Sequence, residues 1–333
     1  QDIKRKCLET ARTEGLLQYI DPMQSYLECL RKLVDWQSIN RAKLKVIHDP
    51  MFGAGMGYLD KLFTGSTVEM ESIHCTCDPL FGGGMPEPTG KSLSAMVALV
   101  KQRGAHLGLA LDGDADRFGA VDSDGKYYTP NQILSMLLYH LIKNRGWKGP
   151  VARTVATTHL LDRICLQEGL RVFETPVGFK FIGQHLLNDG CILGGEESGG
   201  LSIRGHIPEK DGILASLLIV EMISSFGLSL GEIMEEVYQS YGKLVNERLD
   251  IKVSFDQKAK ALRMLKEQAP TSICGQPVVE KLCIDGTKLK LAGGSWVLIR
   301  PSGTEPLLRV YAEAGTTSEL KAIQSEIRRV LGI

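Results

Sequence analysis

The chain has 333 residues, and its 39 lysines and arginines balance 39 aspartates and glutamates, so its formal net charge is zero. This balance excludes a long-range attraction to nucleic acid or to an anionic membrane, and any anionic ligand must be held by a local cluster of positive groups. Hydrophobic residues make up 43% of the chain, no apolar run is long enough to span a membrane, and the length favours two or three domains.

The first part of the chain alternates between helical and strand patterns. Apolar residues recur at helical spacing through residues 1–36, for example at Tyr26, Leu27, Leu30 and Leu33. The segments that follow predict strands at 43–50, 68–73 and 107–111 and helices at 58–63 and 93–103. Such an alternation indicates a sheet covered by helices.

The alternation restarts beyond residue 126 and changes character near residue 244. The second stretch predicts helices at 131–144, 160–168, 181–188 and 212–225 and strands at 151–156, 171–174 and 191–194. The tail predicts strands at 249–253, 295–300 and 307–313 and a polar helix at 318–331. We therefore expect an α/β protein made of two successive α/β/α sandwich domains with mixed sheets, at 1–126 and 127–243, followed by a smaller α+β domain at 244–333.

An acidic loop directly follows the predicted strand at 107–111. It reads Asp112-Gly-Asp114-Ala-Asp116-Arg117, and three carboxylates at alternate positions can converge on one hard cation, for which Mg²⁺ is well suited. Without a cation the three charges would repel one another. An EF-hand is excluded because its sixth loop position must be glycine and is Arg117 here. A solvated acidic turn is the alternative interpretation.

A glycine-rich loop with the sequence Gly194-Gly-Glu196-Glu197-Ser198-Gly-Gly follows the predicted strand at 191–194. Its glycines allow the backbone to approach a ligand closely, and its carboxylates and hydroxyl can exchange hydrogen bonds with sugar hydroxyls. The alternative is a flexible acidic turn.

A third polar loop, Arg300-Pro-Ser302-Gly303-Thr304-Glu305, lies between two predicted strands, with Arg309 beyond it. Its hydroxyls, exposed backbone N–H groups and guanidinium groups could form a phosphate cradle. Three or four charge-assisted hydrogen bonds of about 1.5–3 kcal/mol each would hold a phosphate despite the zero net charge. A polar β-turn is the alternative here.

Two glycine-rich segments look like nucleotide-binding motifs without meeting their requirements. The segment 84–92 has one residue too many between its glycines for a P-loop, and its two prolines remove backbone donors. The segment 53–57 follows a strand, but Tyr58 stands where a dinucleotide fingerprint has its third glycine. A tight strand-to-helix turn is the better interpretation of the second segment.

The three polar loops, in this order, resemble those of the α-D-phosphohexomutases, the family of phosphoglucomutases and phosphomannomutases. The family's metal loop D-G-D-x-D-R matches residues 112–117, its sugar-binding loop G-E-x-S matches residues 195–198, and its phosphate loop R-x-S-G-T-E-P matches residues 300–306. The resemblance covers nearly the whole chain, as the family's second, third and fourth domains.

The resemblance implies a role for each matching residue. Mg²⁺ would bind the three aspartates Asp112, Asp114 and Asp116. The substrate would contact Glu196, Ser198, Lys210, Arg300, Ser302, Gly303, Thr304 and Arg309. The groups nearest the transferring phosphate would be Arg117, Lys180 and His206, of which the last two lie in segments that look like the phosphoglucomutase form of the third domain.

The implied activity is that of an isomerase, a phosphosugar mutase that moves a phosphoryl group between the C1 and C6 hydroxyls of a hexose phosphate through a bisphosphate. Glucose phosphate is favoured and mannose phosphate is possible, because Glu197 and Gly200 stand where relatives that use mannose phosphate often carry Met and His. The family's phosphorylated Ser-His-Asn loop does not occur in these 333 residues. The chain is therefore expected to be inactive alone, with a further α/β domain upstream of Gln1.

Two alternatives stay open at this point: a Mg²⁺-dependent sugar phosphatase that uses Asp112 as its nucleophile, and a non-catalytic module that binds sugar phosphates. The expected partners are a hexose phosphate and a hexose 1,6-bisphosphate, with no nucleic acid and no membrane. The expected location is the cytoplasm, which suits eight scattered cysteines interpreted as reduced thiols. The sequence does not fix the oligomeric state.

Overall fold

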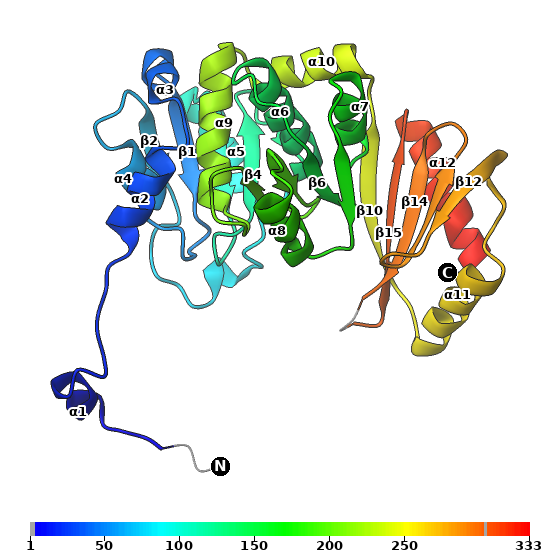
Figure 1. Cartoon of the computed structure of the whole chain (residues 1–333), viewed down its shortest axis with the longest axis horizontal. Coiled ribbons are helices and arrows are strands. Elements are labelled where there is room, and N and C mark those ends of the chain that lie inside the picture. Colours follow the sequence, from blue (N-terminus) through cyan, green and yellow to red (C-terminus); the bar gives the residue numbers. More distant parts are fainter. Residues whose placement is uncertain (1–3, 303–304) are drawn as a thin grey trace.

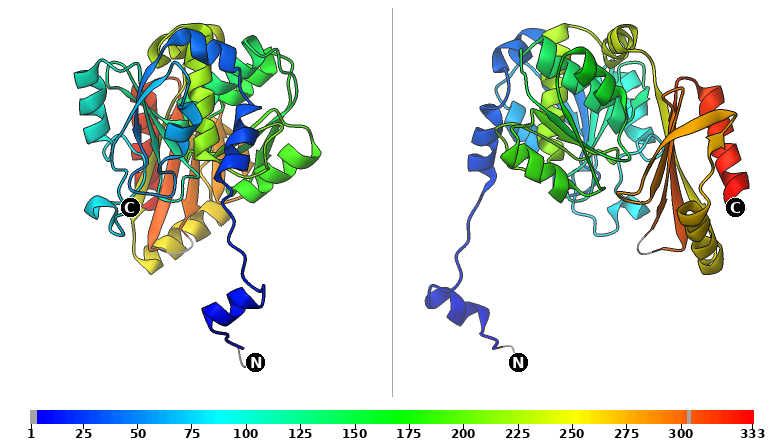
Figure 2. Two further views of the ribbon diagram at one scale, coloured as in Figure 1. Left: turned by 90° about the vertical axis from the view of Figure 1, so that its left-hand side faces the viewer. Right: turned by 45° about the vertical axis from the view of Figure 1, so that its right-hand side comes forward.

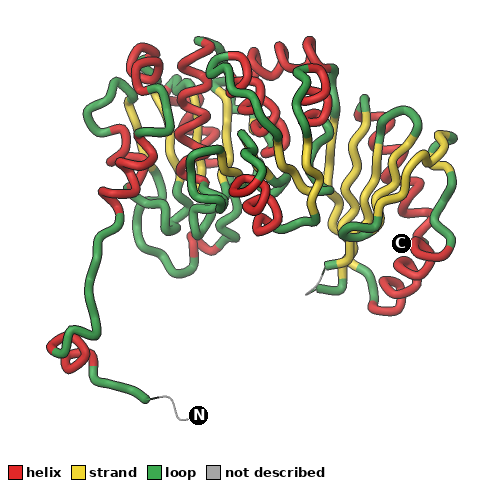
Figure 3. The backbone as a smooth tube through the Cα atoms, in the orientation of Figure 1, coloured by secondary structure: helices red, strands yellow, loops and turns green. Residues whose placement is uncertain are grey.

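The computed structural model describes residues 4–302 and 305–333, and within them three sheets stand side by side along the molecule (Figure 1). The first sheet has the strand order β2-β1-β3-β4-β5, the second β7-β6-β8-β9, and the third β10-β15-β14-β13-β12-β11. Figure 3 shows the strands of all three sheets in yellow, with helices in red around them. The first two sheets are mixed and the third is antiparallel, so the expected fold class is confirmed.

The first sheet is buried on both faces. Its strands are β1 (Lys45–Asp49), β2 (Glu69–Ser72), β3 (Leu107–Leu111), β4 (Phe118–Asp122) and β5 (Tyr127–Tyr128). β1, β2 and β3 run parallel, and all five residues of β3 are buried, as its unbroken apolar sequence requires. Helix α5 (Ser94–Arg103) packs on one face through Met96 and Val100, and α4 (Tyr58–Phe63) contributes to the core on the other.

The continuous helical pattern expected over residues 1–36 is wrong in part. The described residues form three short helices, α1 (Leu8–Thr13), α2 (Met23–Arg31) and α3 (Trp36–Ala42). Gly15 takes a left-handed φ of +71°, Pro22 precedes α2, and the Asp35 side chain caps the first N–H groups of α3. α1 has no buried residue and lies away from the rest of the chain at the end of an extended segment (Figure 2).

The second sheet repeats the topology of the first. Its strands are β6 (Val151–Thr154), β7 (Val172–Thr175), β8 (Leu193–Gly195) and β9 (Leu201–Ile203), and its helices are α6 (Pro130–Lys143), α7 (Leu160–Gln167), α8 (Phe179–Asn188) and α10 (Leu230–Tyr241). In both sheets three parallel strands are followed by one antiparallel strand, in the same spatial order. The β3–β4 and β8–β9 loops are therefore equivalent, and they are the acidic loop and the glycine-rich loop of the sequence.

Helix α9 (Gly212–Phe226) follows the second sheet in sequence but also packs on the first. It contacts α3, β3 and β4 as well as α6 and β9, and its residues 212–223 are all buried. A helix that is apolar around its whole circumference fits such a position between layers. No single helix of the described residues is long and apolar enough to cross a membrane. The pair α9 and α10, which bends by 77° at the break between the helices, has the length and composition of a membrane span only when the two are counted together.

The third sheet carries its helices on one side. Its strands are β10 (Val245–Lys252), β11 (Ser272–Ile273), β12 (Gln276–Leu282), β13 (Thr287–Leu291), β14 (Trp296–Pro301) and β15 (Leu307–Ala314), and its helices are α11 (Phe255–Glu267) and α12 (Thr317–Leu331). Figure 2 (right) shows α11 and α12 on the side away from the other two sheets. The sequence analysis did not predict α10, α11, β4, β5, β9 or β11–β13.

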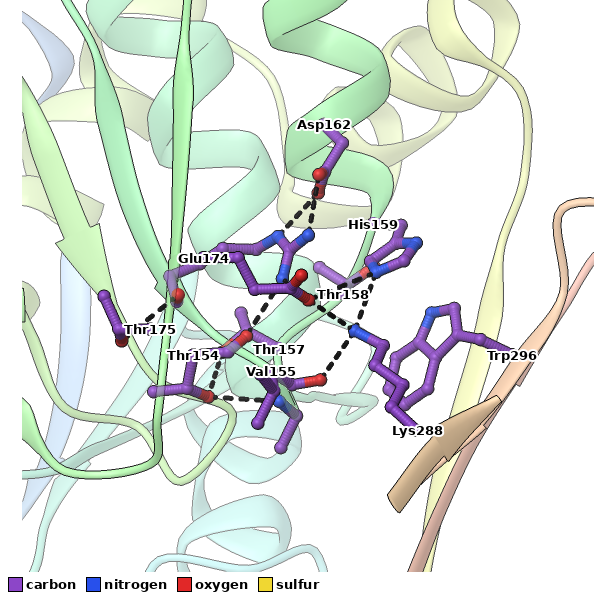
Figure 4. Close-up of polar contacts among 12 residues, drawn as sticks. Thr154, Val155, Thr157, Thr158, His159, Asp162, Glu174, Thr175, Lys288 and Trp296 are labelled. Atoms are coloured by element: carbon purple, nitrogen blue, oxygen red, sulfur yellow. Dashed lines mark hydrogen bonds and ion pairs between the residues drawn. The ribbon is translucent and has the colours of Figure 1, made fainter. Parts of the chain in front are cut away.

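A buried network of charged side chains joins the second and third sheets (Figure 4). Glu174 Oε1, at β7, accepts hydrogen bonds from Arg153 Nη1 at 2.8 Å and from Lys288 Nζ at 2.7 Å. Lys288 also donates to Val155 O at 2.7 Å and lies 4.2 Å from the ring centroid of Trp296. Burial, together with the charge of Arg153, lowers the pKa of Lys288 to about 8. The placement of the third sheet thus depends on ionic contacts between sheets.

Candidate active site

The acidic loop between β3 and β4 brings its three carboxylates together. One ligand oxygen from each of Asp112, Asp114 and Asp116 lies within 4.8 Å of the others. Asp112 is fully buried and accepts hydrogen bonds from Arg117 N at 2.9 Å and Arg117 Nε at 2.6 Å. Burial raises the pKa of Asp112, and the nearby charge of Asp116 adds to the effect while Arg117 opposes it. The loop therefore concentrates negative charge around one point.

These carboxylates fit a divalent cation. Asp116 Oδ1 is buried and has no hydrogen-bond partner among the described residues, so it is an acceptor left for an ion. Carboxylate oxygens are among the hard ligands that Mg²⁺ prefers, so these aspartates would hold such an ion and supply negative charge to it. Within the described ranges, one group of at least three Asp, Glu, His or Cys side chains lies close enough together to hold a metal ion. It consists of Asp112, Asp114 and Asp116.

The two segments that imitate nucleotide-binding motifs hold the acidic loop in place. Ala54 N donates to Gly113 O at 2.9 Å, and Gly113 N donates to Pro86 O at 3.1 Å. A Cβ on Gly53 would lie 2.6 Å from Gly113 O, so only glycine allows this approach. Glu87, in the second segment, accepts a hydrogen bond from Arg117 Nη1 at 2.9 Å. Gly53 and Gly55 of the first segment thus serve close packing against the acidic loop, and the second segment holds it through Pro86 O and Glu87.

The glycine-rich loop between β8 and β9 presents two glutamates in different settings. Glu196 is 5% exposed, and its Oε1 accepts a hydrogen bond from Gly178 N at 3.0 Å. Burial, followed by the charge of Glu197, raises the pKa of the Glu196 carboxyl to about 7. Glu197 is half-buried and accepts from Thr154 Oγ1 at 3.1 Å, whereas Ser198 is exposed. Both glutamates are held in place without any ligand.

The segment before α9 connects the acidic loop with the glycine-rich loop. Lys210 Nζ donates a hydrogen bond to Asp116 Oδ2. The Lys210 side chain also packs against Gly200, where an added Cβ would lie 2.9 Å from Lys210 Cδ. His206 Nε2 lies 2.8 Å from Asp211 Oδ2, and the histidine side chain is only 6% exposed. Lys210 thus lies between the two loops, while His206 is bound to an aspartate that caps α9.

Lys180, near the start of α8, is exposed, with its ammonium 4.9 Å from the ring centroid of Phe181. No hydrogen bond or ion pair among the described residues joins Lys180 to the other predicted site residues. Its place in the site stays a prediction.

The polar loop between β14 and β15 brings two arginines side by side. Arg300 and Arg309 are directly opposite partners on these antiparallel strands. Arg309 Nε is buried without a hydrogen-bond partner among the described residues, so it is a donor left for an anion. Ser302 is 5% exposed, and its Oγ accepts from Glu305 N at 3.2 Å. Gly303 and Thr304 lie outside the described residues.

The acidic loop, the glycine-rich loop and strands of the third sheet line a pocket of about 320 Å³, a volume that suits a small polar ligand. Arg300, Ser302 and Arg309 are not among its described lining residues. Its lining includes residues from all three sheets: Glu87, Arg117, Glu197, Ser198, Arg248 and Tyr311. The sequence analysis assigned no role to Glu87, Arg248 or Tyr311. Glu87 lay inside a segment rejected as a P-loop, and Arg248 and Tyr311 lie on strands whose facing partners no local pattern reveals.

Fold and site together define a class of protein: an α/β protein of repeated mixed sheets, with an acidic loop and a glycine-rich loop that share one pocket with a third, antiparallel sheet. Three family models match it. They describe the phosphoglucomutase/phosphomannomutase α/β/α domain II at residues 24–125, α/β/α domain III at 129–241 and the C-terminal domain at 250–330. The chain belongs to the phosphoglucomutase/phosphomannomutase family.

Curated relatives and solved structures agree with this assignment. A phosphoglucomutase/phosphomannomutase of Thermococcus kodakarensis is 31% identical, over 92% of this chain and 64% of its own length. A probable phosphoglucosamine mutase of Methanothermobacter thermautotrophicus is 30% identical, over 99% of this chain and 69% of its own length. A putative phosphomannomutase of Thermus thermophilus superposes with a TM-score of 0.81 at 31% identity, over 94% of this chain and 67% of that structure. The chain spans about two thirds of the length of these relatives.

Proposed function

We propose that this protein is part of a phosphosugar mutase, an isomerase that moves a phosphoryl group between the C1 and C6 hydroxyls of a hexose phosphate through a hexose 1,6-bisphosphate. The observation that carries the proposal is the shared pocket, because residues of the metal loop, the glycine-rich loop and the third sheet line it together. Family membership supports the same activity. The relatives are named for glucose, mannose and glucosamine phosphates, and these names support the same three classes as candidate substrates.

Each loop has a task in this proposal. Asp112, Asp114 and Asp116 would hold Mg²⁺, which supplies positive charge to offset that of the transferring phosphoryl group. Arg117, fixed by Asp112 and Glu87, presents its guanidinium to the same region.

The other two loops bind the rest of the substrate. Glu196 and Ser198 bind sugar hydroxyls, and Lys210 lies between them and the metal loop. Arg300, Ser302 and Arg309, together with Gly303 and Thr304, bind the phosphate that does not react. Such positioning accounts for most of what phosphoryl transfer requires of a protein.

A phosphatase that uses Asp112 as its nucleophile finds less support. Asp112 is fully buried, and both of its carboxylate oxygens accept hydrogen bonds from Arg117. A nucleophile must be open to the phosphorus atom that it attacks. We propose instead that these 333 residues bind hexose phosphates and, without a phosphorylated serine loop, do not isomerise them.

Calorimetric titration of the chain with glucose 1-phosphate, mannose 1-phosphate and glucosamine 6-phosphate in Mg²⁺ tests the proposal. We expect saturable binding that is strongest for the glucose ester and strongly weakened, but still measurable, in Glu196→Ala and Arg300→Ala. Glu235→Ala and Arg328→Ala, exposed positions on α10 and α12, serve as matched controls with unchanged binding. Binding of none of the esters would contradict the proposal, and release of inorganic phosphate would point to the phosphatase.

A further inference from the structure

The turn between β12 and β13 places an aspartate against the predicted phosphate loop. Gly286 has a φ of +88°, and a Cβ there would lie 2.4 Å from Ile299 O, so the turn is fixed directly against β14. The preceding residue, Asp285, accepts a hydrogen bond on Oδ2 from Arg300 Nε at 2.8 Å. The side chains of Asp285 and Arg300 are 25% and 20% exposed, so this ion pair is largely shielded from water.

The same carboxylate oxygen reaches a second element. Asp285 Oδ2 also accepts from Val177 N at 3.1 Å, in the loop between β7 and α8. The next residue, Gly178, donates its N–H to Glu196 Oε1 at 3.0 Å. Two adjacent backbone amides are therefore bound by Asp285 of the third sheet and by Glu196 of the second. Three hydrogen bonds, joined through the covalent backbone of residues 177–178, therefore connect Arg300 with Glu196.

Arg300 needs such a restraint. It lies directly opposite Arg309 on the neighbouring strand, and like charges in this position repel each other. Asp285 binds Nε only, and the two terminal nitrogens of Arg300 make no hydrogen bond among the described residues. A guanidinium held through Nε keeps its terminal N–H pair in a fixed direction, which is what bidentate binding of a phosphate requires.

We propose that Asp285 is a positioning residue of this site, which sets the distance and direction between the phosphate-binding Arg300 and the sugar-binding Glu196. The inference rests on the proposed function and deepens it. A ligand with both a phosphate and sugar hydroxyls depends on this spacing, whereas inorganic phosphate does not. Asp285 therefore favours hexose phosphates over simple phosphate.

The sign of the effect separates positioning from plain electrostatics. Asp285 carries a negative charge beside a site for an anion, so its removal alone would tighten phosphate binding. If Asp285 positions Arg300, Asp285→Ala weakens binding of glucose 1-phosphate, by about tenfold, while binding of inorganic phosphate changes by a smaller factor. Asp285→Asn keeps an oxygen that can accept both hydrogen bonds and should restore part of the loss.

The test is calorimetric titration of glucose 1-phosphate and inorganic phosphate into the wild-type chain, Asp285→Ala, Asp285→Asn, Arg300→Ala and the double variant Asp285→Ala/Arg300→Ala. Because Asp285 acts through Arg300, the double variant should bind no more weakly than Arg300→Ala alone. Glu280→Gln is the matched control, since it removes a carboxylate on β12 that pairs with Lys290 at 3.0 Å and touches neither loop. Its binding should equal that of the wild type.

The outcomes distinguish this inference from the function on which it rests. Two results would overturn the positioning role while leaving the proposed function intact. In the first, the wild-type chain binds glucose 1-phosphate and both Asp285 variants bind it equally or more tightly. In the second, the losses of affinity in the double variant are additive. If the wild-type chain does not bind glucose 1-phosphate, both the positioning role and the proposed function are contradicted. Asp285→Asn keeps the test decisive if thermal unfolding shows that Asp285→Ala does not fold.

Discussion

The proposed metal loop (112–117) and the proposed phosphate loop (300–306) are held in place largely by different kinds of contact. The metal loop has ion pairs of its own, but its contacts with neighbouring segments include several backbone hydrogen bonds, since Gly113 exchanges hydrogen bonds with two neighbouring segments and Ala115 O accepts from Gly212 N at 3.0 Å. The phosphate loop is fixed by side chains: Arg300 pairs with Asp285, and Lys258 Nζ donates to Ser302 O at 2.6 Å. We expect a loop held mainly by backbone contacts to tolerate changes of charge but not added atoms. We expect a loop held mainly by charged side chains to tolerate added atoms but not the loss of a charge.

The largest expected effect follows from breaking the ionic contacts that carry the third sheet. Glu174→Ala leaves the almost fully buried Lys288 without its carboxylate partner, whereas Arg153 keeps its ion pair with Asp162. Removing one partner of a buried ion pair costs about 3–5 kcal/mol, because a charge stays buried without compensation. Thermal and chemical denaturation should show this loss, with the third sheet unfolding in a separate, earlier transition.

The matched control for that variant is Glu280→Ala, which removes a carboxylate of a more exposed pair with Lys290. A surface pair contributes about 0–1 kcal/mol, so this variant should unfold almost like the wild type. Equal losses in Glu174→Ala and Glu280→Ala would mean that the buried network does not hold the third sheet.

The next effect concerns the backbone contacts of the metal loop. In Gly53→Ala the new Cβ would lie 2.6 Å from Gly113 O and 2.9 Å from Asp112 O, so the metal loop must shift. Such overpacking costs about 1–3 kcal/mol. We expect a lower thermal midpoint and weaker Mg²⁺ binding by calorimetry. Gly84→Ala is the control, because nothing lies within 4 Å of its added atom and its φ is −121°.

A smaller effect is expected from the pH dependence of Glu196. Its folded pKa of about 7 lies above its ordinary value of 4.5, so the folded state binds the proton more tightly. The stability that this group contributes is complete below pH 4.5 and is lost as the pH rises through about 7. Between pH 5 and pH 8 the wild type should lose about 1–2 kcal/mol more than Glu196→Gln, which cannot ionise.

Urea unfolding at the two pH values measures this difference, and Glu235→Gln, an exposed position on α10, controls for the loss of a carboxylate. A parallel pH dependence of the wild type and Glu196→Gln would show that Glu196 is already ionised at pH 5.

The smallest effect separates charge from packing at the metal loop. Lys210 Nζ donates to Asp116 Oδ2 and so competes with a cation for that carboxylate. In Lys210→Met we expect Mg²⁺ to bind several-fold more tightly, about 1 kcal/mol, while glucose 1-phosphate binds more weakly. Both affinities come from calorimetry, and weaker binding of Mg²⁺ would instead mean that Lys210 supports the loop.

The sequence by itself determined the features that depend on neighbouring residues. The unbroken apolar run of β3 predicted a buried strand, and the spacing of Asp112, Asp114 and Asp116 predicted their convergence, because one short loop carries all three. Helix α4 formed within the bounds expected. The family resemblance rested on three such local motifs, and the family models confirm it.

The tertiary structure alone decided which distant segments meet. No local pattern shows that α9 also packs on the first sheet, that Asp285 bridges Arg300 and Val177, or that Glu87 pairs with Arg117. The polar stretch from 254 to 294 also concealed α11, β11 and β12, since a largely exposed helix and largely exposed strands need few apolar residues. β13 was missed although it is largely buried, because lysines alternate with its apolar residues. Local spacing fixes the chemistry that a loop can offer, whereas long-range packing fixes where that chemistry is directed.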